Sequence, residues 1–302
     1  MELGRIRLTD PISKFIPELK TVRGAAKPGT PRPPRGQTYT DDQLEPQARE
    51  ITIKDLATHT SGLNSSVRHT PGDTLATFIP RLRTTALDFQ PGTRWAYSAT
   101  SGPDILARVI EITSGQPYDQ YLKQHIFDPI GMNDTRHNLS AEQFGRLVRR
   151  YERQGDKWVT APGSELAPRT TTYFAGAYGL QSTARDYLLF ESMLLNKGTL
   201  HGKRVLKPES VELMHTNLVG DLYKGTRGDA TGTGFGILVR VVTDAPNSRS
   251  GRSNGAFGWG GAYGTMSWTD PAEQLVAAIM IQQPVAALQH DFEMAVRGAM
   301  TA

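Results

Sequence analysis

The sequence predicts an α+β protein in which an antiparallel sheet is flanked by helices and joined to a helical subdomain. In the middle of the chain, apolar residues recur every three to four positions, as they do in amphipathic helices. From about residue 232 the pattern becomes that of strands, and the final segment, 285–299, is again helical. We expect a single unit over 1–302, with a mostly helical subdomain at about 51–230 and a sheet subdomain formed by about 231–302 and the N-terminal segment.

The predicted helices begin and end at residues that suit helix termini. Before them, residues 20–50 hold few large apolar side chains and several prolines, which predicts a surface loop. Pro103 favours the first turn of a helix that Gly115 ends. Thr183, with Asp186 three residues later, resembles a capping box. The predicted helical segments are 51–58, 103–114, 118–127 (stopping at Asp128-Pro129-Ile130-Gly131), 182–198 and 208–214.

Three strands are predicted near the end of the chain, at 233–243, 256–269 and 274–282. The run Asp270-Pro271-Ala272-Glu273 is typical of a hairpin turn between the last two strands. In the helix over 285–299, four residues share the apolar face that we expect to pack on the sheet. They are Leu288, Phe292, Ala295 and Val296.

The composition excludes several classes of function. The chain has no cysteine, which excludes disulfides, thiolate catalysis and cysteine-based metal sites. Its seven histidines include no helical His-x-x-x-His pair, and no glycine-rich nucleotide motif follows a predicted strand, so we expect neither a metal nor a cofactor. The formal charge is +4, but lysine and arginine form no stripe of the kind that binds nucleic acid, so we expect no nucleic-acid partner.

No apolar run in the sequence is as long as a membrane span, so we expect no membrane span. The first residues also lack the basic and then apolar design of a signal peptide. We therefore expect a cytoplasmic protein if Met1 is the true N-terminus.

Two segments could place reactive groups in a cleft. Tyr97, between the turn at Pro91-Gly92 and the helix over 103–114, could act as a general base if nearby cations lowered the pKa of its phenol. Taken alone, such a tyrosine is far more often a packed amphipathic side chain. The segment 257–265, FGWGGAYGT, has small residues where a ligand could approach, and a strand N–H there could donate to a developing oxyanion. The alternative is a glycine-rich bend at a sheet corner.

Six stretches of the chain, taken in order, carry a resemblance to a known family. They are 8–18, 51–63, 91–115, 128–135, 179–186 and 259–261. Together they resemble the superfamily of serine β-lactamases, penicillin-binding proteins and esterases, most closely its class C enzymes and their carboxylesterase relatives. The resemblance covers almost the whole chain and implies a β-lactamase/transpeptidase-like fold.

The family uses a serine nucleophile with a lysine three residues later, a tyrosine as base or proton shuttle, and a strand N–H that completes the oxyanion hole. By resemblance, Tyr97 would be the catalytic tyrosine, and Ser98 beside it would contact the substrate. The N–H of Ala262 would donate to the oxyanion. The third motif, whose residues would also contact the substrate, comprises Trp259, Gly260 and Gly261. The implied reaction is acyl transfer to a serine, with a small ester or amide as substrate.

Two departures from the family pattern favour esters over β-lactams. The second motif usually ends in asparagine, where this chain has Ala99. The third motif is Lys-Thr-Gly in lactamases, where this chain has Trp259-Gly260-Gly261, so the charged group that would hold a β-lactam carboxylate is missing. Both changes resemble the esterase and acyltransferase branch of the family.

The nucleophile is the larger departure, because no serine in the sequence is followed three residues later by lysine. Arg68 and Arg185 stand at that spacing from Ser65 and Ser182, and arginine stays protonated at neutral pH. We assign the nucleophile to none of the candidate serines, which are Ser61, Ser65, Ser98 and Ser182. We expect the chain to begin after the segment that carries the family's Ser-x-x-Lys motif.

In the family, that segment supplies a central helix and strands that pair with the C-terminal sheet. Without it we expect an unpaired sheet edge and an open apolar groove, which could self-associate or pair with the missing segment. Three interpretations follow. The chain is part of an esterase-like hydrolase that needs the segment for activity, an inactive protein that binds a ligand or partner in the groove, or an unfamiliar enzyme that uses Tyr97 without a serine.

Overall fold

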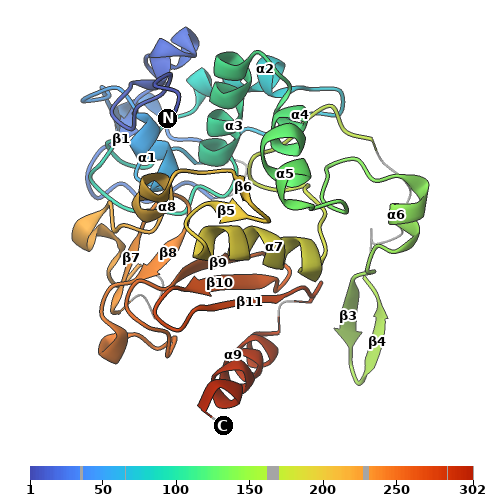
Figure 1. Cartoon of the computed structure of the whole chain (residues 1–302). Coiled ribbons are helices and arrows are strands. Elements are labelled where there is room, and N and C mark those ends of the chain that lie inside the picture. Colours follow the sequence, from blue (N-terminus) through green and yellow to red (C-terminus); the bar gives the residue numbers. More distant parts are fainter. Residues whose placement is uncertain (35–36, 65, 162–169, 227–230, 284, 302) are drawn as a thin grey trace.

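An antiparallel sheet forms one side of the molecule in the computed structural model, and helices form the other (Figure 1). The structure describes residues 1–34, 37–64, 66–161, 170–226, 231–283 and 285–301. The five strands follow the order β11-β10-β9-β8-β7, so each strand pairs with the next along the chain. They are β7 (Thr233–Phe235), β8 (Arg240–Val242), β9 (Phe257–Gly260), β10 (Met266–Asp270) and β11 (Leu275–Ile279). This arrangement confirms the predicted α+β class.

The helical side is built around α1 (Ile53–Ala57) and α3 (Ser101–Ser114). Their apolar faces share one core with the N-terminal segment, in which Ile12 and Leu19 are almost fully buried. Each such side chain stabilises the fold by roughly 1.5–3 kcal/mol. We expected the N-terminal segment in the sheet subdomain, whereas here it packs on helices. The division of the chain into two subdomains stays a prediction.

The other helical elements surround this core and the sheet. The α-helices are α2 (Leu75–Phe78), α4 (Tyr118–Leu122), α5 (Asp128–Ile130), α6 (Ala141–Gly145), α7 (Ala184–Leu195), α8 (Pro208–Met214) and α9 (Ala286–Thr301). Short 3-10 turns span Ile12–Lys14, Pro17–Leu19, Asp41–Gln43, Ile79–Thr84, Gly220–Tyr223 and Ala245–Asn247, and a π-helical turn spans Lys123–Phe127. Within the described ranges, no helix combines the length and the apolar character needed to cross a bilayer.

The predicted helices are confirmed, with some ends shifted. As predicted, Gly115 ends α3, and its φ is +74°. At the start of α7, Thr183 accepts from the N–H of Asp186, but the Asp186 carboxylate binds the N–H of Asp134 instead (2.8 Å), so the capping box is only half formed. The segment from 118 is helical to Ile130, and Gly131, with φ +81°, ends it within the predicted stop. Pro129 is accommodated because it lies in the first turn of α5, where a missing N–H costs nothing.

Two predictions of single strands are wrong, because each segment is a hairpin. The segment 233–243 divides into β7 and β8 around Leu238, whose φ is +57°. The segment 256–269 divides into β9 and β10 around a turn that contains Gly264, whose φ is +93°. The pattern of residues is the same on the two sides of such a turn, so it does not reveal the turn. The third strand and the hairpin turn before it are confirmed, with Asp270 paired to Leu275.

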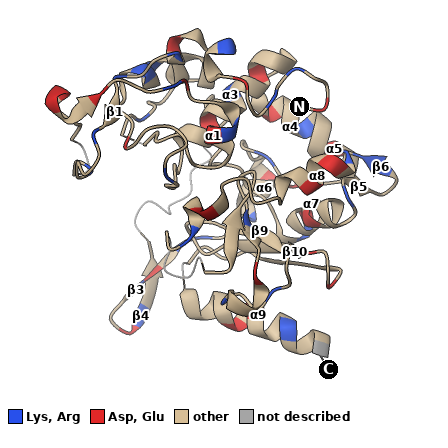
Figure 2. Ribbon diagram, turned by 90° about the vertical axis from the view of Figure 1, so that its left-hand side faces the viewer, with Lys and Arg blue, Asp and Glu red and all other residues tan. Residues whose placement is uncertain are grey.

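Helices lie against both faces of the sheet (Figures 1 and 2). Successive side chains of β10 point to opposite faces. On one face, the buried hydroxyl of Thr269 donates to Glu191 of α7 (2.6 Å), and burial raises the pKa of that glutamate. On the other face, Trp268 is 1% exposed, and its ring lies 5.8 Å from that of Phe292 in α9.

An ion pair helps to attach α9 to the sheet side of the molecule. Arg252, which is 8% exposed, donates from Nε to Glu293 of α9 (2.6 Å). The Arg252 guanidinium also lies 4.2 Å from the centroid of the Trp268 ring. Burial lowers the pKa of Arg252, and the carboxylate of Glu293 opposes that shift, so the two side chains depend on one another.

This ion pair sets the rotation of α9 about its axis. Our prediction that Leu288 and Ala295 face the sheet is wrong, because Leu288 is 44% exposed and Ala295 is exposed as well. Phe292 and Val296 are partly buried, in agreement with the prediction. Apolar periodicity alone could not give this rotation, because the contact that decides it is made by a charged residue.

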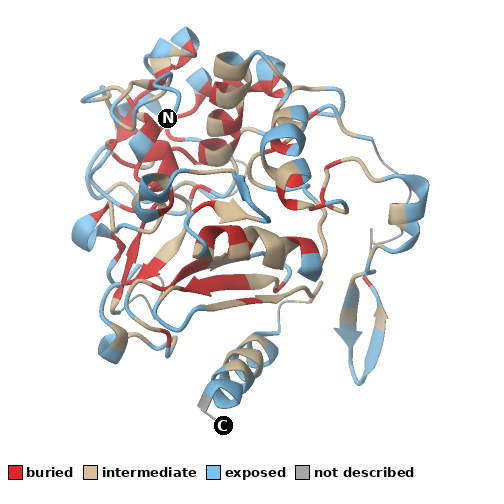
Figure 3. Cartoon of the chain, viewed as in Figure 1, coloured by how far each residue is buried: buried red, intermediate tan, exposed pale blue. Residues whose placement is uncertain are grey.

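Several elements project from this body. The segment 20–50 forms an excursion in which β1 (Ala25–Ala26) pairs with β2 (Leu44–Glu45). The short strands β5 (Thr199–Leu200) and β6 (Lys203–Arg204) form one pair. A hairpin of β3 (Tyr151–Gln154) and β4 (Lys157–Thr160) extends away from the body. Figure 3 shows that this hairpin and α9 are largely exposed, whereas burial concentrates in α1, α3 and the middle of the sheet.

Replacing Glu293 with alanine should destabilise the protein, because it leaves the buried Arg252 without its carboxylate. We expect the free energy of unfolding to fall by about 3 kcal/mol for Glu293→Ala in urea titrations. The matched control is Asp291→Ala, on an exposed position of the same helix, which should change it by less than about 0.5 kcal/mol. Equal unfolding midpoints for the two variants would contradict the role of the ion pair.

Candidate active site

Tyr97 lies in an extended loop that His59 holds at two points. The N–H of Ala96 donates to the carbonyl of His59 (3.0 Å), and the N–H of Ser98 donates to Nδ1 of its ring (3.3 Å). The ring of Tyr97 rests edge-on against the His59 ring, with centroids 4.9 Å apart. Because both neighbours of Tyr97 are tied down, Ser98 is buried while Tyr97 remains 42% exposed.

His59 occupies a backbone conformation that its surroundings must maintain. Its φ is +57°, which is uncommon for a residue other than glycine, and it is 3% exposed. The rings of Trp95 and Phe235 pack on it, with centroids 5.8 and 5.3 Å from that of His59. The loop that presents Tyr97 is therefore anchored from inside by an aromatic cluster.

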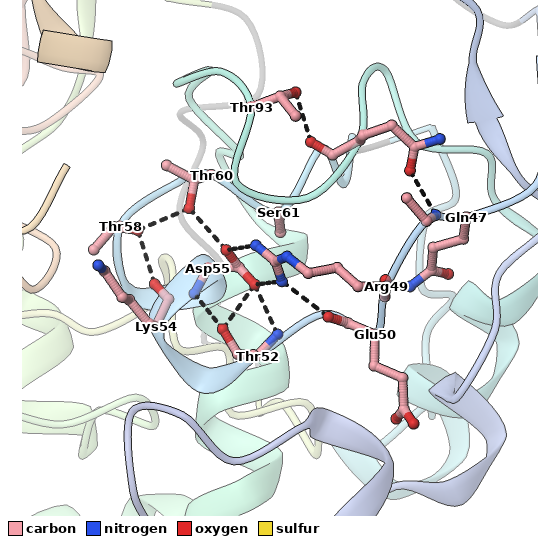
Figure 4. A network of polar contacts seen from close by, with 12 residues as sticks. Gln47, Arg49, Glu50, Thr52, Lys54, Asp55, Thr58, Thr60, Ser61 and Thr93 are labelled. Atoms are coloured by element: carbon pink, nitrogen blue, oxygen red, sulfur yellow. Dashed lines mark hydrogen bonds and ion pairs between the residues drawn. The ribbon is translucent and has the colours of Figure 1, made fainter. Parts of the chain in front are cut away.

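The carboxylate of Asp55 supports the turn that carries His59 (Figure 4). Arg49 donates to both of its oxygens (2.6 and 2.9 Å), Thr52 donates its N–H and hydroxyl, and the hydroxyl of Thr60 donates from the far side. Burial raises the pKa of Asp55, but the hydrogen bonds from Arg49 and Thr52 outweigh burial and hold it below its ordinary value. The N–H of Thr60 also donates to the Asp55 carbonyl, which joins α1 to the turn after it.

Trp259 of β9 meets Tyr97, so the structure brings the second and third predicted motifs together. The two ring centroids are 5.6 Å apart. Trp259 also lies edge-on to Phe235 of β7, at 5.4 Å. The loop around Tyr97 and two strands of the sheet therefore contribute to one aromatic wall, which carries no charged group at the position of the family's lysine.

The turn after β9 presents a backbone donor. Gly260 ends the strand, and the N–H of Gly261 donates to the carbonyl of Thr265 (2.7 Å), which closes the turn. Ala262 follows and is exposed. Among the described residues, none accepts a hydrogen bond from the Ala262 amide. An amide of this kind can donate to the negative oxygen that forms in acyl transfer.

The first turn of α3 joins these parts to a second loop. Asp104 is 2% exposed, and its carboxylate accepts from the amides of Gly176 (2.9 Å) and Ala177 (3.2 Å) and from the hydroxyl of Tyr173 (2.7 Å). Burial raises the pKa of Asp104, although these three donors oppose the shift. Position 176 requires glycine, because a Cβ there would lie 2.3 Å from the carbonyl oxygen of Pro103.

Tyr178 is presented by the same loop and is 47% exposed. Its hydroxyl forms a hydrogen bond with Nε2 of His69. The N–H of Gly102 in α3 donates to the hydroxyl of Ser98 (3.2 Å), so the first turn of α3 contacts both the Tyr97 loop and the Tyr178 loop.

Each candidate serine in the described part of the chain forms a hydrogen bond with a group other than a lysine. Ser61 accepts from the N–H of Leu63, Ser98 accepts from Gly102, and the Ser182 hydroxyl bonds that of Thr135. Ser65 lies outside the described residues. Ala99, at the position of the family's asparagine, is exposed. In the described part of the chain, no group of three or more potential metal ligands comes together.

Three residues of this site were not predicted from the sequence, namely His59, Asp104 and Tyr178. His59 lies in a stretch that carries the family resemblance, yet a histidine there indicates no partner by itself. Asp104 had one local signal, an acidic residue in the first turn of a helix. Tyr178 directly precedes the stretch 179–186. Their contacts join segments distant in sequence, so no spacing along the chain could have paired them.

Comparisons with known proteins agree with this geometry. The sequence model of the family described as Beta-lactamase matches residues 1–295. Protein Rv1367c of Mycobacterium tuberculosis is 33% identical over 307 residues, which cover 92% of this chain and 72% of that protein. Lovastatin esterase of Penicillium rubens is 30% identical over 76% of this chain and 62% of its own length. Among solved structures, EstCE1, "a hydrolase with promiscuous acyltransferase activity", has a TM-score of 0.76 at 21% identity, covering 98% of this chain and 79% of its own. That likeness confirms the predicted β-lactamase/transpeptidase-like fold.

Removing the Asp55 carboxylate should loosen the support of His59 and destabilise the protein. We expect Asp55→Ala to lower the free energy of unfolding by about 2 kcal/mol at pH 7, because a helix cap and hydrogen bonds to a charged group are lost. The pKa of Asp55 is lowered in the folded state, so this contribution is complete above the ordinary value of 3.8 and declines as the pH falls through the lowered pKa. The difference in unfolding free energy between Asp55→Ala and the unaltered protein should therefore shrink as the pH falls.

The control for this measurement is Asp221→Ala, which breaks an exposed ion pair with Lys224. It should leave the unfolding free energy nearly unchanged at every pH. If Asp55→Ala were no more destabilising than this control, the network would not support the turn.

Proposed function

The chain belongs to the β-lactamase family of hydrolases, and from that premise we propose that it carries the tyrosine and oxyanion side of a serine acyl-transfer site for small esters. One observation carries the proposal. Tyr97 and Trp259 lie far apart in the sequence, yet their rings are 5.6 Å apart and Tyr97 is 42% exposed. The exposed amide of Ala262 follows Trp259 by three residues on the same turn.

The proposed reaction assigns one task to each group. As a serine oxygen attacks the carbonyl carbon of the ester, the serine O–H bond breaks and its proton passes toward the Tyr97 oxygen, while the carbonyl oxygen becomes negative. The amide of Ala262 donates to that oxygen. The bond to the alcohol oxygen then breaks, and the departing alcohol takes a proton by way of the Tyr97 hydroxyl, which leaves an acyl-serine. Water attacks the acyl-serine, releases the acid and returns the proton to the serine.

An apolar wall supports esters as the substrate class. Trp259 stands where lactamases carry a lysine, and the exposed Ala99 stands where they carry an asparagine. Neither residue carries a charge that would pair with the carboxylate of a β-lactam, whereas an aromatic wall suits the apolar part of an ester. The names of two similar proteins, lovastatin esterase and the hydrolase EstCE1, accord with this choice.

We also propose that the nucleophilic serine belongs to a segment outside these 302 residues. The support is that no serine in the chain has a lysine three residues later, and that the described candidate serines bond to backbone groups or other hydroxyls. The same observation favours a second candidate function, an inactive protein that binds esters. The reading frame upstream of the Met1 codon distinguishes the two. An in-frame Ser-x-x-Lys supports the hydrolase, and its absence supports the binding protein.

Incubation of the 302-residue chain with p-nitrophenyl butyrate should leave its intact mass unchanged in mass spectrometry, because the nucleophile is not in this chain. Prior acetylation of lysine amines removes them as sites of non-specific reaction. A butyryl group on one of the chain's own serines would overturn the placement of the nucleophile and would also overturn the binding protein.

In the protein that includes the Ser-x-x-Lys segment, Tyr97→Phe should lower kcat/KM for p-nitrophenyl butyrate by roughly 10²- to 10⁴-fold, because the proton of the attacking serine loses its route through Tyr97. Tyr151→Phe is the matched control, since Tyr151 is 46% exposed on the hairpin strand β3. It should retain full activity. Equal activity of the two variants would remove Tyr97 from the mechanism.

A further inference from the structure

A cavity with both polar and apolar lining lies between the excursion that carries β1 and β2 and the segment that includes Asn64 and Arg68. Its volume is about 620 Å³, which falls in the range of roughly 300–1,000 Å³ that small-molecule sites occupy. The side chains that line it are mostly hydrogen-bond donors. They include Arg32, Thr38, Tyr39, Asn64, Ser66 and Arg68.

The carboxylate of Asp88 fixes one side of this cavity. It accepts from the amide of Asn64 (2.9 Å) and from the hydroxyl of Tyr39 (3.0 Å), and it pairs with Arg32 (3.2 Å). Burial, together with the Asp88 charge, raises the pKa of Tyr39 to about 12, so its hydroxyl keeps its proton. Asp88 is thus saturated by these three residues, and its charge offsets that of Arg32.

Arg68 is the positive charge of the cavity that remains without a counterpart. It is exposed on the cavity wall, and no described residue places a carboxylate within ion-pair distance of it. A guanidinium presents its N–H groups as a planar fork that matches the two oxygens of a carboxylate. The Ser66 hydroxyl adds a polar group on the same wall, whereas the side-chain amide of Asn64 is already bonded to Asp88, to the carbonyl of Ala86 and to the N–H of Ser66. The cavity is therefore equipped to bind an anion.

Hydrogen bonds link the wall of the cavity to the elements that carry the proposed active site. The carbonyl of Asn64 accepts from the hydroxyl of Ser101 (2.7 Å), and Ser101 opens α3 directly after the Tyr97 loop. At the other end of this wall, Arg68 precedes His69, which bonds the exposed Tyr178. Asn64 and Arg68, which line the cavity, are thus linked to the Tyr97 loop and to the Tyr178 loop, respectively.

We propose that this cavity binds the carboxylate of a substrate that carries an acidic group besides its ester, with Arg68 as the recognising residue. The substrate class is then the half-esters of dicarboxylic acids and similar acidic esters. The inference rests on the proposed function for the ester end of the molecule. The cavity itself recognises the acidic end of the substrate, so binding of that end can be measured without turnover.

Isothermal titration calorimetry with two matched ligands tests the proposal on the chain as it is. Monomethyl glutarate carries the carboxylate, and methyl 5-amino-5-oxopentanoate replaces it with a neutral amide of nearly the same shape. We expect the acid to bind at least about tenfold more tightly, a difference of about 1.4 kcal/mol. The preference should weaken as NaCl rises, because salt screens exposed charges. Equal affinity for the two ligands would overturn the proposal.

Variants locate the binding to Arg68. Arg68→Gln should abolish the preference for the acid, whereas Arg83→Gln, at an exposed arginine that does not line the cavity, should retain it. Arg68→Lys keeps the charge without the fork, so its preference should lie between those of the unaltered chain and Arg68→Gln. An Arg68→Gln variant that unfolds at the normal urea midpoint and keeps the preference would overturn the assignment.

The outcome for this cavity is independent of the outcome for the ester chemistry. If the acid is preferred but Tyr97→Phe hydrolyses esters normally, the cavity stands and the proposed function fails. If Tyr97 is required and the two ligands bind equally, the proposed function stands and the cavity assignment fails.

Discussion

The buried carboxylate of Asp104 is the contact on which the arrangement of the site depends. A carboxylate that loses its water must find hydrogen-bond donors, or burial costs several kcal/mol. Here the donors are the amides of Gly176 and Ala177 and the hydroxyl of Tyr173, while the start of α3 adds a favourable helix dipole. The first turn of α3 can therefore be buried only with the 173–178 loop folded against it. The same turn bonds Ser98, so the two loops that present exposed tyrosines are fixed with respect to each other.

A second constraint joins the helical side to the sheet through aromatic rings. His59 receives two backbone bonds from the Tyr97 loop, and its ring packs on Phe235, which is itself a residue of β7. Trp259 completes the contact from β9. Aromatic pairs contribute about 0.5–1.5 kcal/mol each beyond the area they bury. The wall is consequently firm and apolar, and the polar recognition that an acidic substrate needs falls to the separate cavity that Arg68 lines.

The sequence predicted the elements better than their ends and their contacts. Helices such as α3 and α7 repeat their apolar residues over two turns or more, so periodicity located them. The turns at Leu238 and Gly264 escaped, because strand residues stand on both sides of each and a single backbone angle decides the direction. The rotation of α9 escaped because it follows from the Arg252–Glu293 pair. In the site, motif order placed Tyr97 near Trp259, whereas the roles of His59 and Asp104 depend on partners that only the folded chain brings near.

A crystal structure of a trapped reaction tests the central claim most directly, namely that Tyr97 and the Ala262 amide face one reacting centre. The protein with its Ser-x-x-Lys segment would be treated with p-nitrophenyl butylphosphonate, whose tetrahedral phosphorus mimics the acyl intermediate. The account predicts a phosphonylated serine, with a phosphonyl oxygen about 3 Å from the Ala262 amide nitrogen and the Tyr97 hydroxyl beside the leaving-group position. A phosphonyl group bound away from both residues would contradict it.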